Sequence, residues 1–129
     1  LHINPGGTLE KRIQYVRDTM NHRQIPTTFV ALKAGELLGG ASLMEQDMDT
    51  HPHLTPWLAN VFVRPDWRGR GLGSLLVERV VDEARALGVH RLFLFTPDRE
   101  SLYARMGWRP IERVDYRGER VVIMDLELS

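Results

Sequence analysis

Apolar residues recur along the chain with two different periods, and these periods predict an alternation of strands and helices. Residues 8–23 and 71–87 carry apolar side chains three and four positions apart, a spacing that places them on one face of a helix. Thr8 is the predicted N-cap of the first helix, which ends before Pro26, and Gly88 is the predicted left-handed cap of the second. Shorter runs rich in β-branched and aromatic residues predict strands. They cover residues 28–32, 37–44, 57–63, 91–95, 111–116 and 121–128.

Polar and glycine-containing segments separate these elements. Short turns at residues 34–36 and 117–119 predict two hairpins, and the proline-punctuated residues 45–56 predict a loop. A short helix is predicted to begin at Thr96 as its N-cap and to stop at Gly107. The order of elements predicts an α/β (α+β) fold with a central, mixed and mainly antiparallel twisted sheet flanked by helices.

The most informative segment joins the predicted strand 57–63 to the predicted helix 71–87. It contains arginines and glycines in alternation, namely Arg68, Gly69, Arg70, Gly71 and Gly73. The unpaired amides of a first helical turn and the helix dipole together bind anions. Arginine adds charge-assisted hydrogen bonds that suit phosphate oxygens. The segment therefore predicts a loop that binds a pyrophosphate.

Two common phosphate-binding motifs do not match this loop. A P-loop needs Lys followed by Ser or Thr after its last glycine, and that pair does not follow Gly73. A Rossmann fingerprint needs glycine at position 74, where Ser74 stands, and an acidic residue about 20 residues further on. Asp82 and Glu83 come too early for that role and lie inside the predicted helix.

The arrangement Arg68-x-x-Gly71-x-Gly73, entered from a strand that ends at Val63, resembles the acetyl-CoA signature of the GNAT family of N-acetyltransferases. A second family element lies downstream, where a buried strand leads to a short helix and the turn Tyr103-x-x-x-Gly107-Trp108. The resemblance covers roughly residues 27–128.

The resemblance implies an acetyl-CoA-dependent acyltransferase that moves an acetyl group to a primary amine by direct attack on the thioester. It implies that two parallel strands splay apart and that the pantetheine arm pairs with the backbone between them. Carried over residue by residue, the cofactor-binding positions are Val61, Phe62, Val63, Arg68, Gly69, Arg70, Gly71, Leu72, Gly73 and Ser74. Tyr103 matches the tyrosine that many members use as a general acid toward the CoA thiolate. A phenol of pKa ~10 stays protonated at neutral pH and can donate to that thiolate.

Carboxylates on the loop 45–56 are candidates for handling the acceptor. Glu45 and Asp47 lie near where the family places the acceptor, and a carboxylate there can bind an ammonium group or relay its proton through water. A merely solvated acidic loop is the alternative. His51 and His53 lack a third ligand at a suitable spacing, so we expect no metal.

Composition limits the remaining possibilities. The 129 residues suit one domain spanning residues 1–129. Acidic and basic residues balance at 17 each, so we expect neither nucleic acid nor a membrane surface as partner. The chain has no cysteine, which excludes a cysteine acyl-intermediate on these residues and fits a cytoplasmic protein.

We expect a small-molecule amine acceptor rather than a protein, and a homodimer is consistent with the family. The chain begins at Leu1 with loop-like residues, so we also expect it to lack an N-terminal strand-helix unit that relatives carry. Two alternatives stay open, namely a non-catalytic acyl-CoA-binding regulatory module and a nucleotide-binding protein that uses the same loop.

Overall fold

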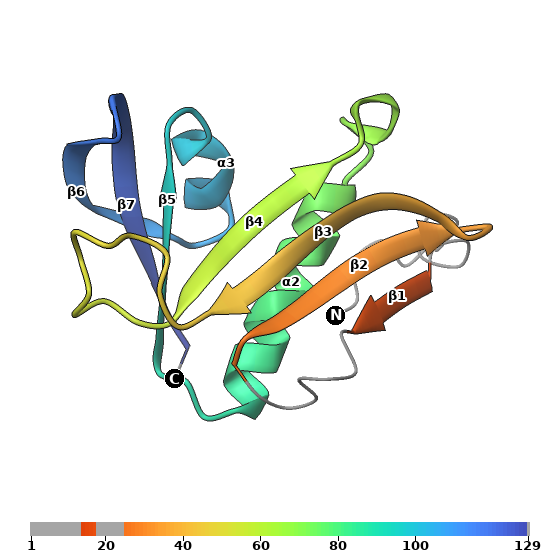
Figure 1. Cartoon of the computed structure of the whole chain (residues 1–129), viewed down its shortest axis with the longest axis horizontal. Helices are drawn as coiled ribbons and strands as arrows, with labels where there is room; N and C mark the ends of the chain where they lie inside the picture. The colour runs from red at the N-terminus through yellow and green to blue at the C-terminus, as the bar shows by residue number, and fades with distance from the viewer. Residues whose placement is uncertain (1–13, 18–24, 129) are drawn as a thin grey trace.

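The computed structural model describes residues 14–17 and 25–128, and the strands within them form one seven-stranded sheet (Figure 1). The strands are β1 (Gln14–Arg17), β2 (Thr27–Lys33), β3 (Glu36–Met44), β4 (Trp57–Val63), β5 (Arg91–Thr96), β6 (Arg109–Tyr116) and β7 (Glu119–Glu127). The helices are η2 (Pro65–Trp67, a 3₁₀ turn), α2 (Leu72–Ala86) and α3 (Glu100–Arg105). The sheet order is β1-β2-β3-β4-β5-β7-β6, and only β4 and β5 run parallel. This confirms the predicted mixed, mainly antiparallel sheet.

The first predicted helix is wrong where the structure describes it. Residues 14–17 form β1, which pairs antiparallel with β2, while the rest of the predicted helix 8–23 lies outside the described residues. The edge of β2 offers unpaired backbone groups, and pairing with that edge outweighs the helical spacing of a few apolar residues. Four residues are too few for the period of a strand to stand out from the period of a helix.

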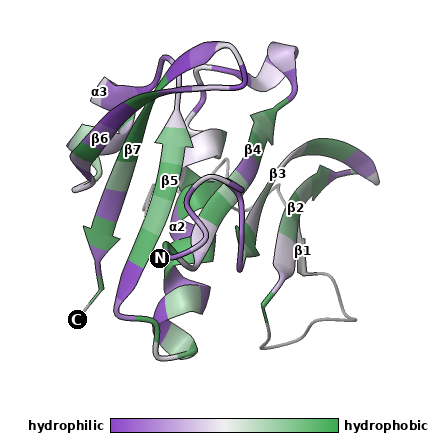
Figure 2. Ribbon diagram, turned by 60° about the vertical axis from the view of Figure 1, so that its left-hand side comes forward, coloured by the Kyte–Doolittle hydropathy of each residue, from purple (hydrophilic) through white to green (hydrophobic). Residues whose placement is uncertain are grey.

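Alternate residues of β5 enter two hydrophobic clusters, one on each face of the sheet. Leu92 and Leu94 pack with α2 and α3 on what we call the helix face. Phe93 and Phe95 pack on the opposite face, which we call the loop face because the loop between β3 and β4 contributes Met48 to it. The strand is therefore buried from both sides, and Figure 2 shows it coloured hydrophobic along most of its length.

The helices differ in how closely they follow the prediction. The helix predicted over residues 71–87 is α2, and Gly88 closes it with a φ of 81° as expected. The short helix α3 starts at Glu100, later than predicted, because Thr96 still belongs to β5. The Thr96 hydroxyl nevertheless accepts a hydrogen bond from the Arg99 amide at 3.0 Å, which fixes the turn between strand and helix. No helix in the described part of the chain is long and apolar enough to cross a membrane.

A buried carboxylate ties the three strands at one end of the sheet together. Asp125 on β7 is 0% exposed, and its two oxygens accept hydrogen bonds from Arg91 of β5 at 2.7 Å and from Arg109 of β6 at 3.2 Å. Burial raises the pKa of the Asp125 carboxyl, but the hydrogen bonds from Arg109 and Arg91 outweigh burial and hold that pKa below its usual value.

We expect Asp125→Asn to lower the free energy of unfolding by about 2 kcal/mol at pH 7, the scale of one charge-assisted hydrogen bond. Because the folded-state pKa is lowered, Asp125 contributes stability above its unfolded pKa of about 3.9. That contribution is lost as the pH falls through the folded value, so the difference between wild type and variant should shrink at pH 3.

Urea unfolding at pH 7 and at pH 3 measures both effects. Asp115→Asn is the control, since this carboxylate on β6 is 76% exposed and should change stability little. An Asp125→Asn variant as stable as the wild type at pH 7 would contradict the role of the buried carboxylate.

Candidate active site

The sheet opens where its two parallel strands meet. The strands β4 and β5 pair only at Trp57 and Phe93, where the Phe93 amide donates to the Pro56 carbonyl at 3.1 Å. Beyond this point the strands diverge, and Figure 1 shows the gap between them widening toward the end of β4. This confirms the splayed strand pair. Among the described residues the backbone of β4 beyond Trp57 has no further pairing with β5.

The strand β4 contains a β-bulge at Asn60. Gly40 pairs with Phe62 and Ser42 pairs with Ala59, so two steps along β3 match three steps along β4. Asn60 has a φ of 57°, in the left-handed region that asparagine tolerates better than most residues. This bulge was not predicted, although an asparagine in the middle of an apolar strand is a signal of one.

The three predicted cofactor-binding positions on β4 follow the bulge. The side chains of Val61 and Val63 are half-buried and pack against the cluster on the helix face. Phe62 is 48% exposed, and its carbonyl passes so close to Gly39 that a Cβ there would lie 2.6 Å from the oxygen. Side-chain packing therefore leaves the backbone edge of this segment available on the side of β5.

The predicted pyrophosphate loop lies at the end of β4 and leads into α2. Gly71 is the N-cap of α2 with a φ of 85°, and Gly69 has a φ of 77°. No side chain caps the first turn, and the turn contains no acidic residue. Among the described residues, the amides of Leu72, Gly73 and Ser74 therefore have no capping side chain and are available to an anion.

The positive charges around this helix end divide into paired and unpaired groups. Arg64 donates to Asp66 at 2.7 Å and to Glu36 at 3.1 Å, so its charge is neutralised. Arg68 and Arg70 form no ion pair with a carboxylate among the described residues, although the charge of Arg70 helps to lower the pKa of Asp66. The Arg68 Nε donates to the Val63 carbonyl at 3.3 Å.

A buried tryptophan orders part of this unpaired charge. The Arg70 guanidinium lies 4.5 Å from the centre of the Trp67 ring, and the Lys33 ammonium lies 5.2 Å from it. Lys33 comes from the end of β2, far away in sequence, and neither it nor Trp67 was predicted from the sequence. Together with Arg68, these groups make the end of α2 a site for an anion of more than one charge.

Gly73 differs from the other glycines of the loop. A Cβ at this position would lie 3.5 Å from the Val63 side chain, an ordinary contact, and its backbone is helical. Among the described residues, neither the available space nor the backbone conformation requires glycine at this position. A ligand that approaches the backbone closely is a sufficient reason for it.

Tyr103 lies on α3, which follows β5 directly. Its ring is 8% exposed and meets the Trp108 ring edge-on at 6.1 Å between centres. Burial raises the pKa of the Tyr103 phenol, against a weaker opposite effect of Arg99. Among the described residues the hydroxyl has no hydrogen-bond partner, so its proton is not committed elsewhere in this part of the chain.

The acidic residues of the loop between β3 and β4 have different environments. Glu45 is exposed. Asp49 accepts hydrogen bonds from the Tyr116 hydroxyl and from the Arg117 guanidinium, both at 3.2 Å. Asp47 is half-buried, lines a cavity and has its pKa raised by desolvation. Of the two predicted catalytic carboxylates, Glu45 and Asp47, only Asp47 therefore lies in a cavity.

The histidines of this loop have protein partners. The His51 Nε2 lies 3.1 Å from Glu112 on β6, and its ring stacks on His53 at 5.9 Å between centres. Within residues 14–17 and 25–128 no cluster of three side chains is suited to hold a metal ion. The His51 contact instead ties the loop to the edge strand of the sheet.

Comparison with known families agrees with this geometry. Residues 4–108 match the model of the acetyltransferase (GNAT) family, which is most of the chain. The chain belongs to the GNAT family. A solved GNAT acetyltransferase from Elizabethkingia anophelis, with acetyl-CoA bound, has the same fold over 91% of this chain and 99% of its own, with a TM-score of 0.67 and 16% identity.

Curated relatives resemble shorter stretches. An amino-acid acetyltransferase of Salmonella typhi is 34% identical over 55 residues, which make up 43% of this chain and 12% of that protein. A glucosamine 6-phosphate N-acetyltransferase of Trypanosoma brucei brucei is 29% identical over 91 residues, which make up 69% of this chain and 62% of that protein. The chain thus spans only part of the length of these relatives.

The bulge at Asn60 leads to a prediction about stability. We expect Asn60→Val to lower the free energy of unfolding by about 2 kcal/mol, because a β-branched residue is strained at positive φ. Asn60→Gly, which tolerates this backbone, should be nearly neutral. Denaturant unfolding of the two variants compares them, and equal stabilities would contradict the left-handed bulge.

Proposed function

We propose that the protein is an acetyl-CoA-dependent N-acetyltransferase that moves an acetyl group to a primary amine by direct attack on the thioester. The observation that carries this proposal is the placement of two features on one strand. Among the described residues, the edge of β4 that β5 leaves unpaired ends at a helix N-terminus with uncapped amides and with two arginines that form no ion pair. Membership of the GNAT family and the acetyl-CoA held by the Elizabethkingia anophelis structure support it.

The donor would bind along β4 and end at α2. The pyrophosphate would accept hydrogen bonds from the backbone of residues 68–74 and from Arg68 and Arg70. The pantetheine amides would pair with the backbone of Val61, Phe62 and Val63 in place of a neighbouring strand. An amide on this strand could then polarise the acetyl carbonyl.

The chemistry follows from this placement. The lone pair of a neutral amine attacks the thioester carbon, and a C–N bond forms while the carbonyl electrons move to oxygen. As the tetrahedral intermediate collapses, the C–S bond breaks, and the leaving thiolate takes a proton from the Tyr103 hydroxyl. The amine nitrogen gives up its own proton to a base. The raised pKa of Tyr103 supports this role, because it keeps the phenol protonated at neutral pH.

We propose Asp47 rather than Glu45 as the carboxylate that meets the acceptor amine. Asp47 lines a cavity, while Glu45 is exposed to solvent. Desolvation raises the Asp47 pKa, and a carboxylate of raised pKa is a better proton acceptor than a solvated one. A small-molecule acceptor, a cytoplasmic location, a single domain and a homodimer stay predictions.

We expect the purified protein to bind acetyl-CoA at one site and the Arg68→Ala/Arg70→Ala double variant to bind it about 100-fold more weakly, at about 1.4 kcal/mol for each lost charged hydrogen bond. Isothermal calorimetry measures this. Arg85→Ala removes one positive charge from the opposite end of α2 and should leave the affinity unchanged. If ATP displaced acetyl-CoA and bound with equal affinity, the result would instead favour a nucleotide-binding protein.

We expect Tyr103→Phe to lower kcat by about 100-fold or more, the scale of a lost general acid, with little change in acetyl-CoA affinity. Release of free thiol in the presence of amines measures the rate, and calorimetry measures the affinity. Binding of acetyl-CoA without turnover in the wild type would favour a regulatory acyl-CoA-binding module. Full activity in the variant would remove Tyr103 from the reaction.

A further inference from the structure

A cavity of about 300 Å³ lies on the loop face, between the loop after β3, the end of β5 and the β6–β7 hairpin. Its lining residues are Asp47, Phe95, Tyr116, Arg117, Glu119 and Val121. We propose, on the basis of the acetyl transfer proposed above, that this cavity binds the acceptor and selects a primary amine that carries no acidic group.

One lining residue of the cavity, Phe95, contacts β4, since its ring meets the Trp57 ring edge-on at 6.1 Å between centres. Phe93 is the last residue of β5 that pairs with β4, and Phe95 lies two residues further along, where the strands have already parted. Phe95 also belongs to the cluster on the loop face, opposite α2 and α3. An acceptor in this cavity would therefore approach the gap from the face opposite the helix that we assign to the pyrophosphate.

The inner wall of the cavity is apolar. The rings of Phe95 and Tyr116 meet edge-on at 5.4 Å between centres, and Val121 is buried beside them. Such a wall suits the methylene chain or the aromatic ring of a small amine. The Tyr116 hydroxyl donates to Asp49, so this ring is held in place.

The charge left open at the cavity is negative. Among the described residues, the side chains of Asp47 and Glu119 have neither an ion-pair nor a hydrogen-bond partner. The remaining charged residue, Arg117, lies 3.2 Å from Asp49 and 5.1 Å from the centre of the Tyr116 ring. Two open carboxylates attract an ammonium group and repel a carboxylate or phosphate.

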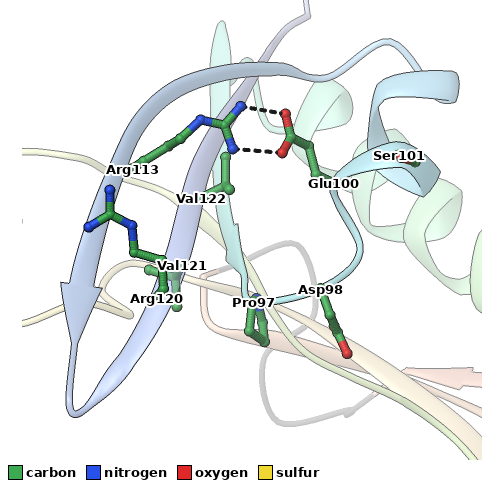
Figure 3. Close-up of a pocket in the computed structure, with 8 residues that line it drawn as sticks. All are labelled: Pro97, Asp98, Glu100, Ser101, Arg113, Arg120, Val121 and Val122. Atoms are coloured by element: carbon green, nitrogen blue, oxygen red, sulfur yellow. Dashed lines mark hydrogen bonds and ion pairs between the residues drawn. The ribbon is translucent and has the colours of Figure 1, made fainter.

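The neighbouring arginines do not reverse this balance. A second cavity of about 340 Å³ lies between the start of α3 and the strands β6 and β7 (Figure 3). In it Arg113 forms two hydrogen bonds of 2.8 Å to Glu100, as Figure 3 shows, and Arg120 lies 3.4 Å from Asp115. These cations are already paired, so neither cavity offers an unpaired cation to an acidic group of the acceptor.

This charge pattern points away from the acceptors named for the relatives. An amino acid carries a carboxylate and glucosamine 6-phosphate carries a phosphate, and each would face the open carboxylates of Asp47 and Glu119. An amine without such a group is attracted by these carboxylates and carries no negative charge that they would repel. The predicted class is therefore simple aliphatic or aryl-alkyl amines and diamines.

Matched pairs of amines test this selection directly, since tyramine and tyrosine, or cadaverine and lysine, differ only by a carboxylate. Calorimetry of the protein saturated with CoA should show each amine binding at least about tenfold more tightly than its amino acid. The Asp47→Asn/Glu119→Gln double variant, which keeps side-chain shape, should bring this ratio close to one. Glu127→Gln removes an exposed charge from the far end of β7, outside the cavity, and leaves Arg109 paired with Asp125, so it should leave the ratio unchanged.

The outcomes separate this proposal from the proposed reaction. If acetyl-CoA binds but either amino acid binds as tightly as its amine, or neither amine binds, the acceptor assignment is overturned and the donor site stands. If acetyl-CoA does not bind, the acetyl transfer itself is overturned, and the cavity loses its assignment as an acceptor site. A preference that survives the double variant would place the selection elsewhere in the protein.

Discussion

The site depends on one interruption of backbone pairing. A strand in the middle of a sheet normally has both edges satisfied, yet β4 pairs with β3 along its length and with β5 only at Trp57. The bulge at Asn60 adds one residue to β4 and bends the strand beyond the point where it leaves β5. Backbone groups left without partners are costly unless water or a ligand satisfies them. The gap is therefore suited to an extended ligand with amides, and the divergence of the strands also fixes where the two reactants can meet.

The two sides of this gap differ in the sign of the charges that remain without an ion pair among the described residues. Most charged groups around it are neutralised within the chain, as in the pair of Arg113 with Glu100 and the pair of Arg64 with Asp66. The charged groups that form no ion pair among the described residues are separated by sign. Arg68 and Arg70 lie at the start of α2, where amide dipoles add to their field, whereas Asp47 lies on the loop face. A donor that carries phosphates and an acceptor that carries an ammonium would each find the opposite charge.

The sequence predicts the donor side better than the acceptor side, for physical reasons. The strand 57–63, the helix over residues 71–87 and the loop between them follow from local signals, namely periodicity, glycines and arginines close together in the chain. The strand β1 was predicted as a helix, because only its pairing with β2 makes it a strand. The position of Lys33 over the Trp67 ring and the raised pKa of Asp47 depend on contacts between segments far apart in sequence. No local pattern predicts them.

The match to the family model also covers the donor side better than the acceptor side. The match to the GNAT family covers residues 4–108, which include β4, the pyrophosphate loop and Tyr103. It ends before β6 and β7, and the hairpin of these strands supplies Tyr116, Glu119 and much of the rest of the loop-face cavity. Relatives can therefore share the donor site with this chain and still differ in the acceptor. The acceptor has to be argued from the hairpin and the loop after β3. Two of their carboxylates have no partner among the described residues, and under our proposal they would favour a cation over the acidic acceptors named for the relatives.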